Sequence, residues 1–316
     1  MIPRTLYDSD HEMFRQSVRK FIETHAIPNH ETWEKEGMVS DEVWLGAGSQ
    51  GFLCPTVAEK YGGVHADFRY NCIVNEEIAR SGCSGLGWTL HSDIAVPYIE
   101  RYGTEYQKEK YLSRCVSGEL ITAIAMSEPG AGSDLQGTKT NAVLDGDHYI
   151  LNGSKTFITN GQKSGLVIVV AKTDVSAGSK GISLFLVESE FEGFSKGKNL
   201  EKLGMKAQDT SELFFQDVRV PKENLLGEEG RGFIYLMQDL PQERLSIAVG
   251  AIANAQALLE STIDYTKERK AFGVSVASFQ NTQFKLAELS AEISSAEVFL
   301  DRCTELLLND LSLIHI

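Results

Sequence analysis

Met126-Ser127-Glu128-Pro129-Gly130-Ala131-Gly132-Ser133-Asp134-Leu135 is the stretch that tells most about how this chain folds and what it binds. Its small, hydroxyl-bearing and proline residues predict a turn that exposes backbone N–H groups and carries no bulky Cβ atoms. Such a turn can lie against a polar, phosphorylated or flat ligand. The stretch therefore predicts a ligand-binding loop, with a simple turn as the alternative.

A second segment, Lys155-Thr156-Phe157-Ile158-Thr159-Asn160-Gly161, follows the strand-like run Tyr149-Ile150-Leu151. Its aromatic ring could stack on a flat ligand, and a neighbouring hydroxyl could donate a hydrogen bond at the edge of that ligand. Ordinary packing of the phenylalanine within a strand is the alternative. Together, the two segments predict a site for a flat ligand with a polar edge.

The composition predicts a large, structured protein with more than one folded unit. At 316 residues, with 42% hydrophobic and 9% aromatic residues, the chain can bury a sizeable core. The net charge of −14 argues against nucleic acid or an anionic membrane as a general partner, although an anionic small ligand could still bind locally. An odd number of cysteines without a Cys-x-x-Cys pair predicts reduced, mostly buried thiols at Cys54, Cys72, Cys83, Cys115 and Cys303.

The chain shows no membrane-spanning or targeting pattern. No apolar run approaches the roughly 20 residues that a helix needs to span a bilayer. Residues 1–8 lack the apolar core of a signal peptide and the acid-poor character of a transit peptide. We therefore expect a cytoplasmic protein, or one of the mitochondrial matrix if the chain has been processed.

Hydrophobic spacing predicts an α+β protein built from three consecutive domains. Residues 1–120 are expected to form an all-helical domain, with helical patterns over residues 8–28, 41–51, 68–80 and 106–117. Residues 121–230 carry short β-rich runs separated by turn signals, at 166–171, 181–187 and 213–220. This spacing fits a small antiparallel barrel or sandwich.

Residues 231–316 are expected to form a C-terminal helical bundle. An apolar stripe over about five turns is formed by Leu245, Ala248, Ile252, Ala255, Leu259 and Ile263. Pro241 should kink or interrupt the helix just upstream of this stripe. A last helical pattern covers residues 282–308.

The two binding segments resemble the flavin site of the acyl-CoA dehydrogenase family, and the resemblance runs nearly from end to end. Further matching runs cover residues 204–213, 217–221, 225–233, 240–245 and 268–273. Pro241-Gln242-Glu243-Arg244-Leu245 and the Phe157-Ile158-Thr159 form of the flavin motif are most similar to the long-chain branch. Family members continue with further helices, so the resemblance implies a truncated member with an incomplete bundle and an uncovered apolar stripe.

Glu243 is the predicted catalytic base. It comes just after Pro241 and begins the apolar stripe, although a glutamate on a long helix is more often a solvated surface acid. By resemblance, the long-chain and isovaleryl-type branches keep their base at this position. Removing a proton α to a thioester requires a carboxylate whose pKa is raised by an apolar pocket. The β-hydride requires a cofactor as acceptor, since no side chain accepts hydride.

The resemblance also implies which residues bind cofactor and substrate. FAD contacts are assigned to Ile124, Ala125, Met126, Ser127, Ser133, Phe157, Ile158 and Thr159. Substrate binding is assigned to Ser133, Ser179, Lys180, Pro241, Gln242 and Arg244. Of these, Ser179, Lys180 and Arg244 would touch the coenzyme A moiety, and Ser133 would lie near its phosphopantetheine. Arg269 and Gln280 would reach the flavin of a neighbouring subunit, which implies a homo-oligomer of two or four chains.

The predicted function is FAD-dependent α,β-dehydrogenation of an acyl-CoA thioester, of the long-chain kind by resemblance, to the trans-2-enoyl-CoA. Electron transfer flavoprotein would accept the electrons. Two alternatives stay open: an acyl-CoA oxidase that uses O₂, and a non-catalytic acyl-CoA-binding or scaffold protein. The sequence has no Walker-type loop and no Gly-x-Gly-x-x-Gly turn that follows a strand, so a nucleotide-binding domain of either kind is not expected. It also has no His-Glu-x-x-His or Cys-x-x-Cys spacing, so we expect no metal.

Overall fold

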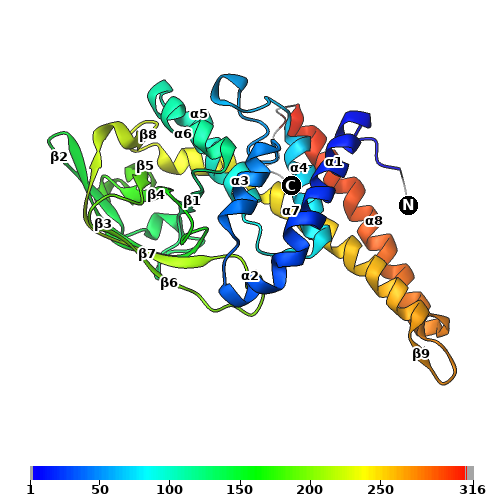
Figure 1. The fold of residues 1–316 in the computed structure, drawn as a ribbon. Coiled ribbons are helices and arrows are strands. Elements are labelled where there is room, and N and C mark those ends of the chain that lie inside the picture. The colour runs from blue at the N-terminus through cyan, green and yellow to red at the C-terminus, as the bar shows by residue number, and fades with distance from the viewer. Residues whose placement is uncertain (1–2, 310, 312–316) are drawn as a thin grey trace. The chain divides into compact units, whose positions relative to one another are not determined.

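The computed structural model describes residues 3–309 and residue 311. Residues 310 and 312–316, which end the expected C-terminal bundle segment, lie outside the described residues. Helices occupy the beginning and end of the chain and strands its middle, so the predicted α+β class is confirmed (Figure 1). The chain forms two compact units that cut across the three expected segments. We call them the β-unit (Pro28–Ala66 and Ser84–Glu243) and the helical unit (Met1–Ile27, Asp67–Cys83 and Arg244–Ile316).

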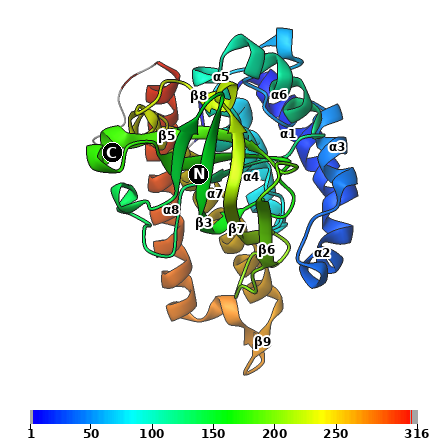
Figure 2. The same ribbon diagram turned by 90° about the vertical axis from the view of Figure 1, so that its left-hand side faces the viewer.

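The β-unit is built on one eight-stranded sheet, in the order β6-β7-β3-β2-β4-β5-β8, with β1 paired to β4. Its strands are β1 (Thr122–Ala125), β2 (Asn141–Asp145), β3 (His148–Thr159), β4 (Leu166–Lys172), β5 (Ile182–Glu188), β6 (Phe194–Asn199), β7 (Thr210–Pro221) and β8 (Leu225–Leu226). Most neighbours are antiparallel, as expected, but β4 runs parallel to both β1 and β2. Figure 2 shows β3, β7 and β6 side by side.

The core of the sheet follows from its sequence pattern. β4 and β5 are apolar and buried along nearly their whole length, because both faces are covered. β3 and β7 instead alternate between buried and exposed residues, so one face packs inward and the other faces solvent. Tyr149, Leu151, Phe185 and Val218 belong to the resulting hydrophobic cluster.

Short helices complete the β-unit: α2 (His30–Glu36), α3 (Asp41–Ser49), the π-helix Leu90–Ala95, α5 (Val96–Tyr102) and α6 (Glu105–Ser117). α6 begins at a capping box formed by Thr104 and Gln107 and ends at Gly118 in the left-handed conformation. The sequence analysis missed the turns over residues 90–102, where Pro97 interrupts any clear start signal. α7 (Gly232–Glu268) runs through Pro241 as one helix, so of the two expected effects the interruption is wrong and the kink stays a prediction.

The helical unit contains α1 (Ser9–Phe21), the π-helix Ile22–Ala26, α4 (Phe68–Ser81), the C-terminal part of α7, and α8 (Gln280–Leu308). The strands β9 (Lys270–Ala271) and β10 (Val274–Ser275) form a hairpin that joins α7 to α8 (Figure 1). The core joins Phe68 and Cys72 of α4 to Leu245 and Val249 of α7 and Leu300 of α8.

The expected apolar stripe on α7 is only partly right. Leu245 is buried, and the most enclosed positions then recur at Val249 and Ala253. The other members of the predicted stripe are half-buried. Large apolar side chains are exposed elsewhere on α7 and α8, namely Ile247, Leu258, Tyr265, Phe284 and Phe299.

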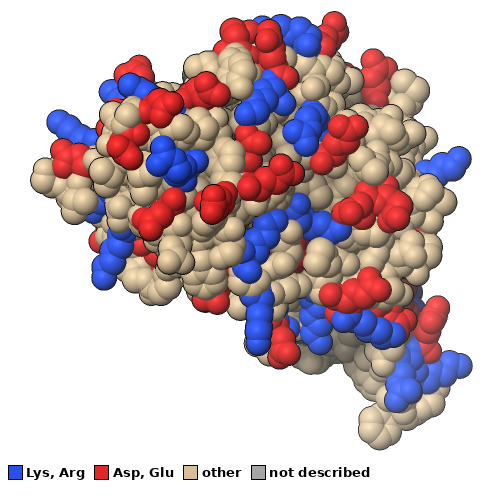
Figure 3. All heavy atoms as spheres, turned by 60° about the vertical axis from the view of Figure 1, so that its left-hand side comes forward, with Lys and Arg blue, Asp and Glu red and all other residues tan. Residues whose placement is uncertain are grey.

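The cysteines, the surface charge, and the search for membrane-spanning helices and metal-binding groups can be described for the whole set of described residues. All five cysteines are free and buried, as predicted. On the face drawn in Figure 3, acidic and basic side chains are interspersed. Within residues 3–309 and 311, no helix combines the length and apolarity needed to cross a bilayer. In that same part of the chain, no group of three or more His, Cys, Asp or Glu residues is placed to hold a metal ion.

Candidate functional site

The structure brings the two predicted flavin segments together. The backbone N–H of Thr156 donates to the carbonyl of Ser127 at 2.9 Å, and the Lys155 ammonium donates to the carbonyl of Met126 at 3.1 Å. The first segment leaves the end of β1, and the second is the end of β3. These contacts fix the loop after β1 against the last residues of β3.

A buried ion pair holds the same two segments. Lys155 Nζ lies 2.9 Å from Glu128 Oε1, and their side chains are 0% and 6% exposed. Glu128 also accepts hydrogen bonds from the backbone N–H groups of Lys139 and Thr140, at 2.7 and 3.0 Å. Burial lowers the pKa of Lys155 to about 8. Burial opposes charge on Glu128 as well, but the hydrogen bond and charge of Lys155 and the hydrogen bonds from Thr140 and Lys139 together outweigh it and lower the pKa of that carboxyl.

Neither Lys155 nor Glu128 was predicted from the sequence as a site residue. The alternation along β3 could have indicated that Lys155 is buried. Lys155 has an odd residue number, as do Tyr149 and Leu151, and all three face inward. A lysine on the inward face of a strand requires a buried partner of opposite charge.

Phe157 is turned out of the sheet. Its φ of 58° lies in the left-handed region, which phenylalanine seldom adopts, and its side chain is 71% exposed. The pairing of β3 with β7 changes register between Lys155 and Ile158, so a bulge re-aims the side chain. Just beyond, the buried Asn160 amide donates to the carbonyls of Gly87 and Thr122, which anchors the end of β3. A strained backbone thus presents an aromatic ring to solvent or to a ligand.

The other predicted flavin residues differ in whether their side chains or only their backbone groups can contact a ligand. The side chains of Ala125 and Ile158 belong to the core of the sheet, and Ile124 is also buried, so these residues can offer only backbone groups. Met126, Ser127 and Thr159 are half-buried, and Ser133 is exposed. Gly130 and Gly132 border open space. An exposed ring beside an open loop and backbone polar groups fits a flat cofactor with a polar edge.

Glu243 is buried in the β-unit, with 6% of its surface exposed. The hydroxyl of Tyr98, from α5, donates to Glu243 Oε1 at 2.7 Å. Burial raises the pKa of the Glu243 carboxyl, and the Tyr98 hydrogen bond and the Arg101 charge partly offset this effect. The alternative of a solvated surface glutamate is therefore wrong.

Arg101 links α5 to the turn of α7 that precedes Glu243. Its guanidinium contacts the buried Asp239 carboxylate and donates to Gln242 Oε1 at 2.6 Å. The Gln242 amide in turn donates to the backbone carbonyl of Asp93 at 2.8 Å. Gln242, a predicted substrate-binding residue, thus uses both ends of its amide to hold α7 in place.

The remaining predicted residues lie on more exposed parts of the chain. Ser179 and Lys180 lie in the 3₁₀ segment Val175–Gly181 and are half-buried and exposed, respectively. Pro241 is half-buried within α7. Arg244, Arg269 and Gln280 are exposed and belong to the helical unit, the last two flanking the β9–β10 hairpin.

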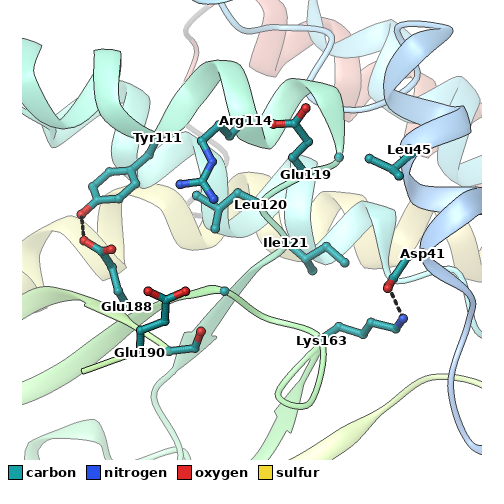
Figure 4. Close-up of a pocket in the computed structure, with 13 residues that line it drawn as sticks. Asp41, Leu45, Tyr111, Arg114, Glu119, Leu120, Ile121, Lys163, Glu188 and Glu190 are labelled. Carbon is teal, nitrogen blue, oxygen red and sulfur yellow. Dashed lines mark hydrogen bonds and ion pairs between the residues drawn. The ribbon is translucent and has the colours of Figure 1, made fainter. Parts of the chain in front are cut away.

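A separate polar cavity of about 600 Å³ opens in the β-unit (Figure 4). Tyr111 donates to Glu188 at 2.8 Å on one side, and Lys163 pairs with Asp41 on the other. The described residues that line it include none of the predicted site residues. Carboxylates and cationic side chains both line this cavity. A lining of this polarity does not suit an acyl chain.

Comparisons with known proteins agree with the arrangement of segments. Models of the acyl-CoA dehydrogenase N-terminal, middle and C-terminal domains match residues 8–119, 123–218 and 230–312. The chain therefore belongs to the acyl-CoA dehydrogenase family, whose members are oxidoreductases that act on the CH–CH bond of acyl-CoA thioesters.

Individual relatives cover nearly all of the chain. Mouse mitochondrial long-chain specific acyl-CoA dehydrogenase is 55% identical over 305 residues, which are 96% of this chain and 71% of that protein. The crystal structure of an acyl-CoA dehydrogenase from Geobacillus kaustophilus has a TM-score of 0.97 at 51% identity, covering 98% of this chain and 82% of the other. An acyl-CoA dehydrogenase from Bacillus anthracis complexed with FAD has a TM-score of 0.90 at 34% identity, covering 96% and 52%.

Proposed function

We propose that this protein is an FAD-dependent dehydrogenase of long-chain acyl-CoA thioesters, with Glu243 as the base that removes the α-proton. The observation that carries the proposal is the buried Glu243 carboxylate, whose pKa is raised by burial. It lies in the same compact unit as both predicted flavin segments. A carboxylate with a raised pKa is a stronger base than a solvated one.

The residues around Phe157 support FAD as the cofactor. The exposed ring at a strained position can stack on a flat ring system, and Thr159 and the backbone of residues 124–127 can hydrogen-bond to its edge. Bound FAD would accept the β-hydride of the substrate. The relative from Bacillus anthracis was solved as a complex with FAD, in agreement with this choice.

Substrate and partners follow from the family. Ser133, Ser179, Lys180, Pro241, Gln242 and Arg244 are proposed to form the substrate site. Ser179, Lys180 and Arg244 would touch the coenzyme A part, and Gln242 would hold α7 in place through its amide. The long-chain relatives support a long acyl group. Electron transfer flavoprotein is the proposed electron acceptor, and hydrogen peroxide formed under air would instead indicate an oxidase. Arg269 and Gln280 are proposed to act across a subunit contact in a homo-oligomer. The mouse relative is mitochondrial, and a processed form of this chain would act in the same compartment.

The test of the proposal is Glu243→Gln. Glutamine keeps the shape of the side chain but cannot accept a proton, so we expect flavin binding to persist and turnover to fall by several orders of magnitude. Glu260→Gln is the matched control, because Glu260 lies on the same helix but forms an exposed ion pair with Arg80. Stopped-flow flavin reduction measures the rate. If Glu243→Gln reduces its flavin as fast as the control, the base is another residue.

A further inference from the structure

Tyr98 is the one residue, among those that the structure describes, that hydrogen-bonds to the Glu243 side chain. The two residues are 145 positions apart in the sequence, and their oxygens are 2.7 Å apart. Tyr98 is fully buried on α5, and its ring lies 6.1 Å from that of Tyr102. A buried tyrosine has few rotamers, so its hydroxyl can define one direction for the carboxylate.

The phenol acts as a donor. Burial, together with the nearby Glu243 carboxylate, raises the pKa of Tyr98, so the hydroxyl keeps its proton at neutral pH. A donor that faces a carboxylate stabilises its charged form. The Tyr98 hydrogen bond therefore lowers the pKa of Glu243, whereas burial raises that pKa because it favours the protonated acid.

Among the described residues, the other charged groups around Glu243 make no hydrogen bond to its carboxylate. Arg101, one turn along α5 from Tyr98, contacts Asp239 and Gln242. On the side of the Leu90–Ala95 π-helix, Asp93 offers its backbone carbonyl to Gln242. Arg244, the next residue on α7, is exposed. The direct polar contact to the carboxylate thus comes from a neutral hydroxyl, not from a formal cation.

We infer that Tyr98 is a positioning residue whose hydroxyl holds the Glu243 carboxylate ionised and aimed in one direction. The inference rests on the proposed role of Glu243 as the base. A cation in this place would hold the carboxylate more strongly and weaken it as a base, whereas a phenol orients it at a smaller cost to its basicity.

The test is Tyr98→Phe, which keeps the ring and removes the donor. Loss of the hydrogen bond should raise the pKa of Glu243, so the acid limb of the pH profile of flavin reduction should move up by about one pH unit. The rate on the plateau should also fall, because the carboxylate is no longer aimed. Tyr102→Phe is the control, since its hydroxyl contacts Gln238 at 3.2 Å and not Glu243. In the control, the acid limb of the pH profile should lie at the same pH as in the parent protein.

A second readout requires no turnover. The infrared band of the protonated Glu243 carboxyl, isolated by subtracting the spectrum of Glu243→Gln, should titrate at higher pH in Tyr98→Phe than in the parent. An unshifted titration and an unshifted limb would overturn the inference. If Glu243→Gln itself turns over normally, the proposed base is wrong instead. If Glu243→Gln is inactive but Tyr98→Phe matches Tyr102→Phe, only the role of Tyr98 fails.

Discussion

His91 shows at the scale of one residue how burial sets a protonation state. Its Nδ1 accepts from the backbone N–H of Thr122 at 3.1 Å and lies 2.7 Å from the hydroxyl of the same residue, while Nε2 lies 3.0 Å from the carbonyl of Cys115. These partners require the neutral ring with its proton on Nε2. Burial lowers the pKa of His91 to about 4. The neutral imidazole ties β1, from which the predicted flavin loop departs, to α6.

We predict that His91 makes the protein sensitive to acid. Between pH 6.5 and about 4 the unfolded chain binds a proton that the folded state excludes, so stability is complete above pH 6.5 and falls as the pH is lowered. From the shift in pKa, the loss amounts to about 3 kcal/mol. His91→Gln lacks this proton, so the gap in unfolding free energy between parent and variant should shrink over that range. A gap that stays constant from pH 7 to 4 would contradict the assignment.

At the scale of single residues, some features of the site could be predicted from the sequence and others could not. Glu243 could be proposed from the sequence because it follows Pro241 and because the Pro-Gln-Glu-Arg-Leu run that resembles the family is a local feature. Tyr98 was missed because its contact with Glu243 spans 145 residues, and nothing around Pro97-Tyr98 marks a partner. Burial of Glu243 and a pKa above its usual range are properties of the packed fold, which spacing along the chain does not reveal.

At the scale of elements, the Lys155–Glu128 pair joins β3 to the loop that follows β1. We predict that Lys155→Met lowers the unfolding free energy by about 3–5 kcal/mol, because it leaves a buried carboxylate without its counterion. Adding Glu128→Gln should recover part of that loss, since both charges are then gone. Lys35→Met is the control, because the Lys35–Glu31 pair is exposed and should contribute less than about 1 kcal/mol.

The measurement is urea unfolding followed by tryptophan fluorescence. Trp33, Trp44 and Trp88 are all buried and all belong to the β-unit, so the signal reports on the unit that contains the pair. Equal losses for Lys155→Met and Lys35→Met would show that the buried pair contributes no more than a surface one. If Lys155→Met instead lowers flavin affinity and leaves the unfolding free energy unchanged, the Lys155–Glu128 pair acts only on the conformation of the loop after β1.

At the scale of the whole molecule, the order of helical and β-rich segments was predictable and the way they assemble was not. Continuous apolar runs such as residues 166–171 and 181–187 identify buried strands from composition alone. The two compact units instead combine segments far apart in the chain, such as Asp67–Cys83 with Arg244–Ile316. Those associations depend on long-range packing of Cys72, Val249 and Leu300, which periodicity within one helix does not specify.

The central claim, that this family member oxidises acyl-CoA through a bound flavin with Glu243 as base, is tested most directly by one absorbance experiment. The purified chain, supplied with excess FAD and freed of unbound cofactor, is scanned before and after a long-chain acyl-CoA is added without oxygen. We predict a flavin spectrum that bleaches on addition in the parent and persists in Glu243→Gln. A chain that retains no flavin, or a bound flavin that acyl-CoA leaves oxidised, would contradict the claim.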